Sequence, residues 1–205
     1  MSLNLSQRQI RVVLSFFLFL IPIPSALAGE ASDTVAQLQE TILKIMKGGE
    51  EWGYKGRYEI ITPVVDKTHD LPVIARITTG RHWKKMTPEE QVKFTDTFNE
   101  LTHSTYAGRF NSYSGEEFSL ISEKSVKRNR KLIQTRFVKA DGEEIRFNYI
   151  LHQANDQWKI INIIVNGVSD LALKRTEYSS ILKKNGYPSL IEKLLAQIEE
   201  NADRL

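Results

Sequence analysis

Histidines are the side chains of this sequence best suited to acid–base or metal chemistry, and they are scattered. His69, His82, His103 and His152 show none of the short spacings that a metal site uses. The sequence has no cysteine, which excludes a thiol nucleophile and a disulfide framework. It also has no glycine-rich phosphate loop and no nucleophile elbow. We therefore predict no catalytic residue, no metal and no cofactor.

Charged side chains gather in pairs and in one basic cluster. The carboxylate pairs Glu89-Glu90 and Glu143-Glu144 are better explained by a helix cap and a solvated hairpin than by acid–base catalysis. The basic cluster on a predicted hairpin consists of Lys124, Lys127, Arg128, Arg130, Lys131 and Arg136. This cluster is either an exposed turn or a docking surface for a membrane or a partner.

The first 28 residues have the pattern of a cleaved signal peptide. Arg8 and Arg11 precede an apolar run over residues 12–21, and Ala26-Leu27-Ala28 offers a small-x-small cleavage site. The run is short for a membrane span, which needs about 20 residues, although a retained anchor is the alternative. We expect export to the periplasm of a Gram-negative envelope and one domain over residues 29–205. Without Arg8 and Arg11 its net charge is close to zero, which does not favour nucleic-acid binding.

The elements that must position any binding site begin with helices. Residues 32–47 carry one apolar stripe and end at Gly48-Gly49, and residues 57–66 predict a second helix. A third begins with Asp70 as N-cap and closes at Gly80. Two more helices are expected at the end of the chain, over 169–185, ended by Gly186, and over 189–203, capped by Ser189.

The central helix is the most strongly marked. Thr87-Pro88-Glu89-Glu90 predicts a capping box, and the helix is expected to run to about residue 112. It carries two apolar stripes about 120° apart, Phe94, Phe98 and Leu101 on one and Tyr106, Phe110 and Tyr113 on the other. Either this helix bends near His103 or it faces two different apolar environments.

A period of two follows Gly115 and predicts an antiparallel meander of about four strands. Asp141-Gly142 and Asn155-Asp156 mark turns, and residues 158–166 are apolar on both faces, as expected for a strand covered on both sides. Helices, then strands, then helices is an α+β layout. Because four strands cannot close a barrel, we expect a curved sheet that curls around the helices and opens widest beside the central one.

An excess of large apolar side chains is expected to face this space. Each is an ordinary core residue when taken alone, but together they allow a cavity for a hydrophobic ligand. The predicted lining residues are Trp83, Phe94, Phe98, Tyr106, Phe110, Tyr113, Phe137, Phe147, Tyr149 and Val165.

Ordered motifs over residues 33–195 resemble one family. They include Leu71-Pro72, Gly80-x-x-Trp83, the run from Tyr106-Ala107 to Gly115, Gly167-Val168-Ser169 and Gly186-x-x-x-Leu190. The set resembles the toluene-tolerance family of periplasmic lipid-binding proteins, the MlaC family, with details closer to the hopanoid-associated branch called HpnM. One departure is Asn162, where an aspartate is usual in MlaC.

The resemblance implies a nuclear-transport-factor-like cone and no enzymatic activity. It further implies that residues 29–205 form a single lipid-binding domain. This monomeric carrier would move phospholipid between an outer-membrane lipoprotein complex and an inner-membrane ABC transporter complex, as an auxiliary component that maintains outer-membrane lipid asymmetry. The alternatives are a carrier of hopanoid or another hydrophobic ligand, and a non-catalytic envelope adaptor with a filled core. An isomerase-like enzyme on the same fold is a further alternative.

Overall fold

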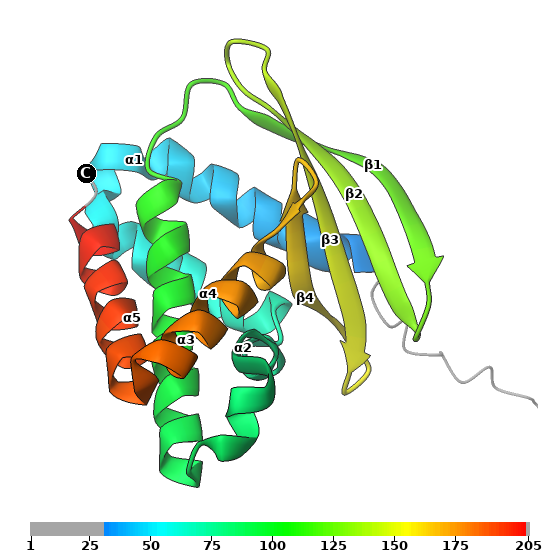
Figure 1. Ribbon diagram of the computed structural model, residues 1–205. Helices are drawn as coiled ribbons and strands as arrows, with labels where there is room; N and C mark the ends of the chain where they lie inside the picture. Colours follow the sequence, from blue (N-terminus) through cyan, green and yellow to red (C-terminus); the bar gives the residue numbers. More distant parts are fainter. Residues whose placement is uncertain (1–30, 204–205) are drawn as a thin grey trace, which may run out of the picture.

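The computed structural model describes residues 31–203, and within them the chain forms an α+β fold (Figure 1). The α-helices are α1 (Ala31–Thr68), α2 (Leu71–Thr79), α3 (Pro88–Arg109), α4 (Asp170–Lys184) and α5 (Gly186–Ala202), with a 3₁₀-helix, η1 (Gly80–Lys85), after α2. The strands are β1 (Glu117–Val126), β2 (Arg130–Val138), β3 (Glu144–Ala154), β4 (Gln157–Val165) and β5 (Val168–Ser169). The predicted signal peptide lies outside the described residues, and no helix within them is long and apolar enough to cross a bilayer.

The strands form the expected meander. All five lie in one antiparallel sheet in the order β1-β2-β3-β4-β5, and the fifth is only two residues long. The turn at Asn155-Asp156 has positive φ at both residues, which suits a two-residue hairpin. One face of the sheet packs on α1, and the helices α3, α4 and α5 stand beside the β4 edge (Figure 1).

Strand β4 differs from the prediction because it carries a bulge. Leu151 pairs with Ile160 but Ile150 pairs with Asn162, so Ile161 is an extra residue. The bulge brings Ile163 onto the same face as Ile160, although strict alternation along the strand would place them on opposite faces. Complete burial of the strand is also confined to residues 160–161, and residues 162–165 are half-buried. The strand is therefore less covered than its apolar sequence suggests.

Helix α1 is one assigned element with a break in its middle. Its backbone leaves helical geometry at Gly49 and Gly53, where φ is 43° and 59°, so the two predicted helices are joined by this short break. The buried Arg57 side chain follows the break and donates to the Ala107 carbonyl of α3 (2.9 Å) and to the Gly49 carbonyl (2.7 Å). Arg57 thus fixes the bend of α1 against α3.

The helix caps follow local sequence with one exception. Thr87 and Glu90 form both bonds of the predicted capping box, and Asp70 accepts from the Val73 amide at the start of α2. Helix α3 ends at Arg109 rather than at residue 112. The prediction for Ser189 was wrong, because α5 already begins at Gly186 and the Ser189 hydroxyl donates to the Asn185 carbonyl instead.

Candidate functional site

A cavity of about 350 Å³ opens between the β4 side of the sheet and the helices α3, α4 and α5. Its interior is lined by apolar and aromatic side chains, namely Leu71, Ile74, Phe98, Leu101, Tyr106, Phe110, Phe147, Ile160, Ile161, Ile163, Val165 and Leu171. The polar lining residues are His69, Thr102, Thr105, Arg109, Asn162, Asp170, Lys174, Gln197, Glu200 and Asn201. Such a lining suits a ligand with a large apolar part and a polar end.

Half of the ten predicted lining residues meet in this cavity. Helix α3 and the residue after it contribute Phe98, Tyr106 and Phe110, and the sheet contributes Phe147 on β3 and Val165 on β4. The sequence placed them on separate elements, and the fold brings them to one space. Whether they contact a ligand stays a prediction.

The other five predicted residues lie elsewhere. Trp83 and Phe94 pack edge to face in the region between η1 and α3, with ring centroids 6.4 Å apart. Phe137 is buried against Phe118, with centroids 4.7 Å apart. Tyr149 lies under α1, where its hydroxyl accepts from Gln39 (3.2 Å). Tyr113 is 39% exposed after the end of α3. Phe94, Phe137 and Tyr149 therefore belong to the packed core, Trp83 packs against it, and Tyr113 lies at the surface.

A buried histidine lies in the wall of the cavity. Thr68 donates its one hydroxyl hydrogen to the Val64 carbonyl (2.7 Å), so it accepts from His69 Nδ1 (3.0 Å). His69 Nε2 then accepts from the Tyr106 hydroxyl at 3.1 Å. Burial lowers the pKa of His69 to about 4 and raises the pKa of Tyr106. Both groups are therefore neutral near pH 7, which keeps charge out of this wall.

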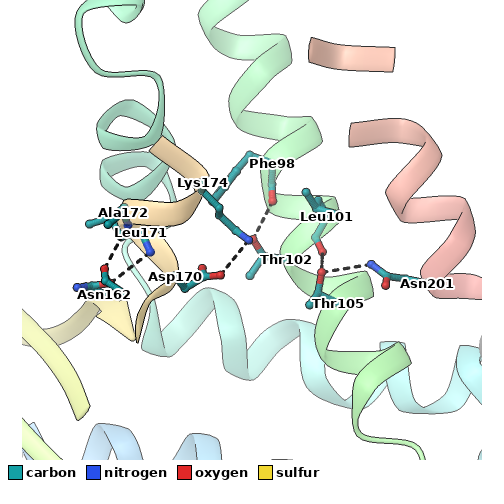
Figure 2. A network of polar contacts seen from close by, with 11 residues as sticks. Phe98, Leu101, Thr102, Thr105, Asn162, Asp170, Leu171, Ala172, Lys174 and Asn201 are labelled. Atoms are coloured by element: carbon teal, nitrogen blue, oxygen red, sulfur yellow. Dashed lines mark hydrogen bonds and ion pairs between the residues drawn. The ribbon is translucent and has the colours of Figure 1, made fainter. Parts of the chain in front are cut away.

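A polar network holds the rim together (Figure 2). Asn162 Oδ1 accepts from the Ser169 hydroxyl (3.0 Å) and from the Leu171 amide (3.4 Å), which ties the start of α4 to β4. An aspartate at this position could accept the same two bonds. Within α4, Lys174 pairs with Asp170 at 3.1 Å.

On the opposite side of the rim, α5 meets α3 at close range. The Asn201 amide donates to Ser104 (3.1 Å) and Thr105 (3.2 Å), as Figure 2 shows for Thr105. A Cβ atom at Gly108 would lie only 2.7 Å from the Asn201 carbonyl oxygen. The absence of a side chain at Gly108 therefore lets the two helices close this side of the cavity.

Sequence reasoning missed the residues that α2, α4 and α5 contribute. Leu71 was visible in the Leu71-Pro72 motif, and Asp170 and Leu171 directly follow the Gly167-Val168-Ser169 motif. Gln197, Glu200 and Asn201 had no such signal, because a polar stretch near the end of a chain normally faces solvent.

The site has the composition of a binding site. Its buried polar groups hydrogen-bond to one another or to backbone atoms, as the His69 and Asn162 contacts show. Within residues 31–203, no group of three or more His, Cys, Asp or Glu side chains is placed to hold a metal ion. The arrangement can enclose an apolar ligand and offer charged groups at its opening.

Comparison with protein families gives one match that covers most of the chain. The family described as "MlaC protein" matches residues 36–196.

Among curated relatives, the toluene tolerance protein ttg2D of Pseudomonas putida is 22% identical over 189 residues, covering 90% of this chain and 86% of the relative. The intermembrane phospholipid transport system binding protein MlaC of Haemophilus influenzae is 29% identical over 119 residues, which is 56% of each chain. A solved structure of a phospholipid-binding protein from Ralstonia solanacearum, in complex with a phospholipid, is similar with a TM-score of 0.71. It is 20% identical, and the match covers 85% of this chain and all of that one, which supports the α+β fold.

Proposed function

This chain belongs to the MlaC family, and from that premise we propose that it is a phospholipid carrier that holds its lipid in the cavity between β4 and α3–α5. The observation that carries the proposal is the lining of that cavity, which joins buried apolar residues such as Phe98 and Ile160 with exposed charged residues such as Arg109 and Glu200. The relatives named for phospholipid transport and phospholipid binding support the same ligand class.

The physical demand on a lipid carrier is to replace the bilayer around acyl chains. Each methylene moved from an apolar environment into water costs about 0.8 kcal/mol, so a carrier must supply a comparably apolar surface. Ile160, Ile163 and Val165 on β4 and Phe110 at the end of α3 provide such a surface. Contacts of this kind are individually weak and have no fixed direction, which allows the lipid to leave again.

The size and the lining of the cavity support a placement for the parts of the lipid. About 350 Å³ is near the lower end of the range of roughly 300–1,000 Å³ for ligand sites. We propose that acyl chains occupy the interior and that the headgroup stays at the rim, beside Arg109, Asp170, Lys174 and Glu200. The aromatic residues predicted from sequence that line this interior would contact the chains.

Two alternatives fit less well. The MlaC family is a family of non-catalytic lipid-binding proteins, and the chain is accordingly not an enzyme. An adaptor with a filled core would not need an apolar cavity, so the cavity favours a carrier. The hopanoid-associated branch stays a prediction, because a hopanoid would also fit an apolar lining.

The compartment and the partners of this carrier are part of the same proposal. We expect residues 1–28 to be removed on export and the carrier to work in the periplasm. There it would exchange lipid transiently with an inner-membrane ABC transporter complex and an outer-membrane lipoprotein complex. The family name and the relative named for intermembrane phospholipid transport support this setting.

The test is native mass spectrometry of the protein purified from the periplasm, followed by lipid extraction. A bound mass of phospholipid size supports the proposal. A bound hopanoid would replace phospholipid by the first alternative, and protein without any lipid under mild conditions would contradict the carrier.

A matched pair of variants on β4 localises the lipid. Ile163 lines the cavity, whereas its half-buried neighbour Ile164 points to the other face of the sheet, opposite Asn148. Ile163→Asp should remove most of the bound lipid because it places a charge among the acyl chains. Ile164→Asp should keep it. Equal lipid content in the two variants would place the lipid elsewhere.

A further inference from the structure

The two ends of the sheet carry opposite charge. The turn between β1 and β2 and the strand residues beside it form a group that we call the basic end, made up of Lys124, Lys127, Arg128 and Arg130. The opposite end of the same strands carries the acidic residues Glu116, Glu117, Asp141, Glu143 and Glu144. The separation follows from the hairpin topology, which places residues 127–129 and 139–143 at opposite ends of β2 (Figure 1).

The charges of the basic end are uncompensated. Of the six basic residues on this hairpin, Lys131 pairs with Glu123 (3.0 Å) and Arg136 pairs with Glu144 (2.8 Å). The four of the basic end make no ion pair with any carboxylate among residues 31–203. Lys124, Lys127 and Arg128 are exposed. At the acidic end, by contrast, Glu143 and Glu144 are both paired with cations.

The backbone of the turn holds an arginine where other residues are favoured. Arg128 and Asn129 have φ of 65° and 50°, in the left-handed region that favours Gly, Asn and Asp. The neighbouring hairpin at the same end of the sheet uses Asn155 and Asp156 for the same conformation. Arg128 therefore brings a charge to the tip of the turn at a conformational cost that Asn at the same position would reduce.

The shape and surroundings of the basic end indicate the partner. The turn projects from the end of the sheet in Figure 1, and none of its four residues lines the cavity. Next to it on β1, Ile121 and Val126 are exposed apolar side chains, 55% and 37% accessible. An exposed basic turn with apolar neighbours matches an anionic layer with an apolar interior, and each Lys or Arg near such a surface contributes about a fivefold gain in binding.

We propose that the basic end binds the surface of a membrane rich in anionic phospholipid. This contact is separate from the cavity, whose sheet residues Phe147 and Val165 lie toward the opposite end of β3 and β4. The protein would thus rest on a membrane by one end while the cavity stays at its side. The inference does not depend on what the cavity binds.

The experiment measures co-sedimentation of the protein with vesicles of phosphatidylcholine, with and without phosphatidylglycerol. At an ionic strength of about 0.01 M, where the screening length is about 30 Å, the wild type should bind only the anionic vesicles. Binding should weaken at about 0.15 M, where that length is about 8 Å. The double variant Lys127→Gln/Arg128→Asn, with Asn chosen because it tolerates the left-handed backbone, should bind about 30-fold more weakly.

The control is Lys183→Gln/Lys184→Gln, which removes the same charge from two exposed residues in the last turn of α4. This control should bind like the wild type. Equal loss in both double variants would overturn the proposal, because net charge alone would then explain binding. A wild type that binds both kinds of vesicle equally would overturn it too. The basic residues would then show no preference for anionic lipid, as expected if they only protect the β1 edge strand from aggregation.

Native mass spectrometry of the same proteins separates this inference from the carrier function. The Lys127→Gln/Arg128→Asn protein should keep the lipid content of the wild type. A wild type that carries lipid but ignores anionic vesicles would overturn the membrane contact and leave the carrier standing. Vesicle binding without any bound lipid would do the reverse.

Discussion

Two aromatic pairs on α3 have the same spacing and nearly the same geometry but different surroundings. Phe94 and Phe98 stack with centroids 6.1 Å apart, and Tyr106 and Phe110, three turns further on, stack at 6.0 Å. The first pair is buried, with 0% and 2% of its surface exposed. The second pair is half-buried and lines the cavity with both rings, whereas only Phe98 of the first pair reaches the cavity. The same i, i+4 spacing on a helix therefore occurs in a fully buried pair with one ring at the cavity wall and in a half-buried pair with both rings there.

What differs is the element opposite each pair. Phe94 meets Trp83 of η1 and Tyr178 of α4, both edge to face, at centroid distances of 6.4 and 6.2 Å. Tyr106 contacts His69 edge to face, and both Tyr106 and Phe110 line the cavity. The continuous helix α3 thus faces two environments, and no bend near His103 is needed to explain its two stripes.

The largest effect is expected on stability, when one aromatic ring is removed from each pair. Phe94→Ala should lower the free energy of unfolding by about 3–5 kcal/mol, because it opens a void in a packed region. Phe110→Ala removes a side chain that is only half-buried and should cost about 1 kcal/mol. Urea unfolding of the two variants measures the difference, and lipid content should fall in Phe110→Ala. Equal destabilisation would mean that both ends of α3 are packed alike.

The free energy of unfolding should depend on pH through His69, which contacts Tyr106 of the second pair. Its pKa is lowered to about 4 in the folded protein, compared with about 6.5 when unfolded, so the unfolded state alone binds a proton between these values. The free energy of unfolding should therefore fall by up to about 3 kcal/mol from pH 6.5 to pH 4 through this group.

The variant His69→Gln isolates that contribution. Carboxylates also titrate in this range, so the measurement is the difference between the wild type and His69→Gln in urea unfolding at several pH values. The variant should lose less stability on acidification. Parallel curves would show that His69 is not buried as the structure places it.

The smallest effect on stability is expected from removing single tyrosine hydroxyls, one at each aromatic pair. Tyr106→Phe leaves His69 Nε2 without its donor and should cost about 1–3 kcal/mol. Tyr178→Phe should change stability by less than about 0.5 kcal/mol, because the Tyr178 hydroxyl has no hydrogen-bond partner among residues 31–203. Thermal unfolding of both variants checks this, and a loss in Tyr178→Phe as large as in Tyr106→Phe would contradict it.

Local signals were enough to predict much of the fold. The caps at Asp70 and Thr87 and the turn at Asn155-Asp156 formed as expected, since each depends on residues within four positions of one another. The two failures differ in origin. The β4 bulge at Ile161 has a non-local cause, because it depends on pairing with β3. The failure at Ser189 is local, because α5 already begins at Gly186, three residues earlier.

The candidate site shows the same contrast between what residue type predicts and what depends on distant elements. Phe98, Tyr106 and Phe147 were found because large apolar residues are conspicuous in a sequence. Trp83, Phe94 and Tyr149 were equally conspicuous but lie in filled regions. Lys174 and Asn201 were passed over because polar residues on end helices resemble ordinary surface.

The sequence by itself determined the order of helices and strands, the curved meander and the charge of its basic turn, because these depend on periodicity, turn residues and residue type. Only the tertiary structure decided which apolar side chains enclose space and which fill it. That outcome depends on whether a side chain from a distant element, such as Trp83 or His69, reaches the opposite wall. Packing of this kind is set by three-dimensional distance, and no short stretch of sequence contains it.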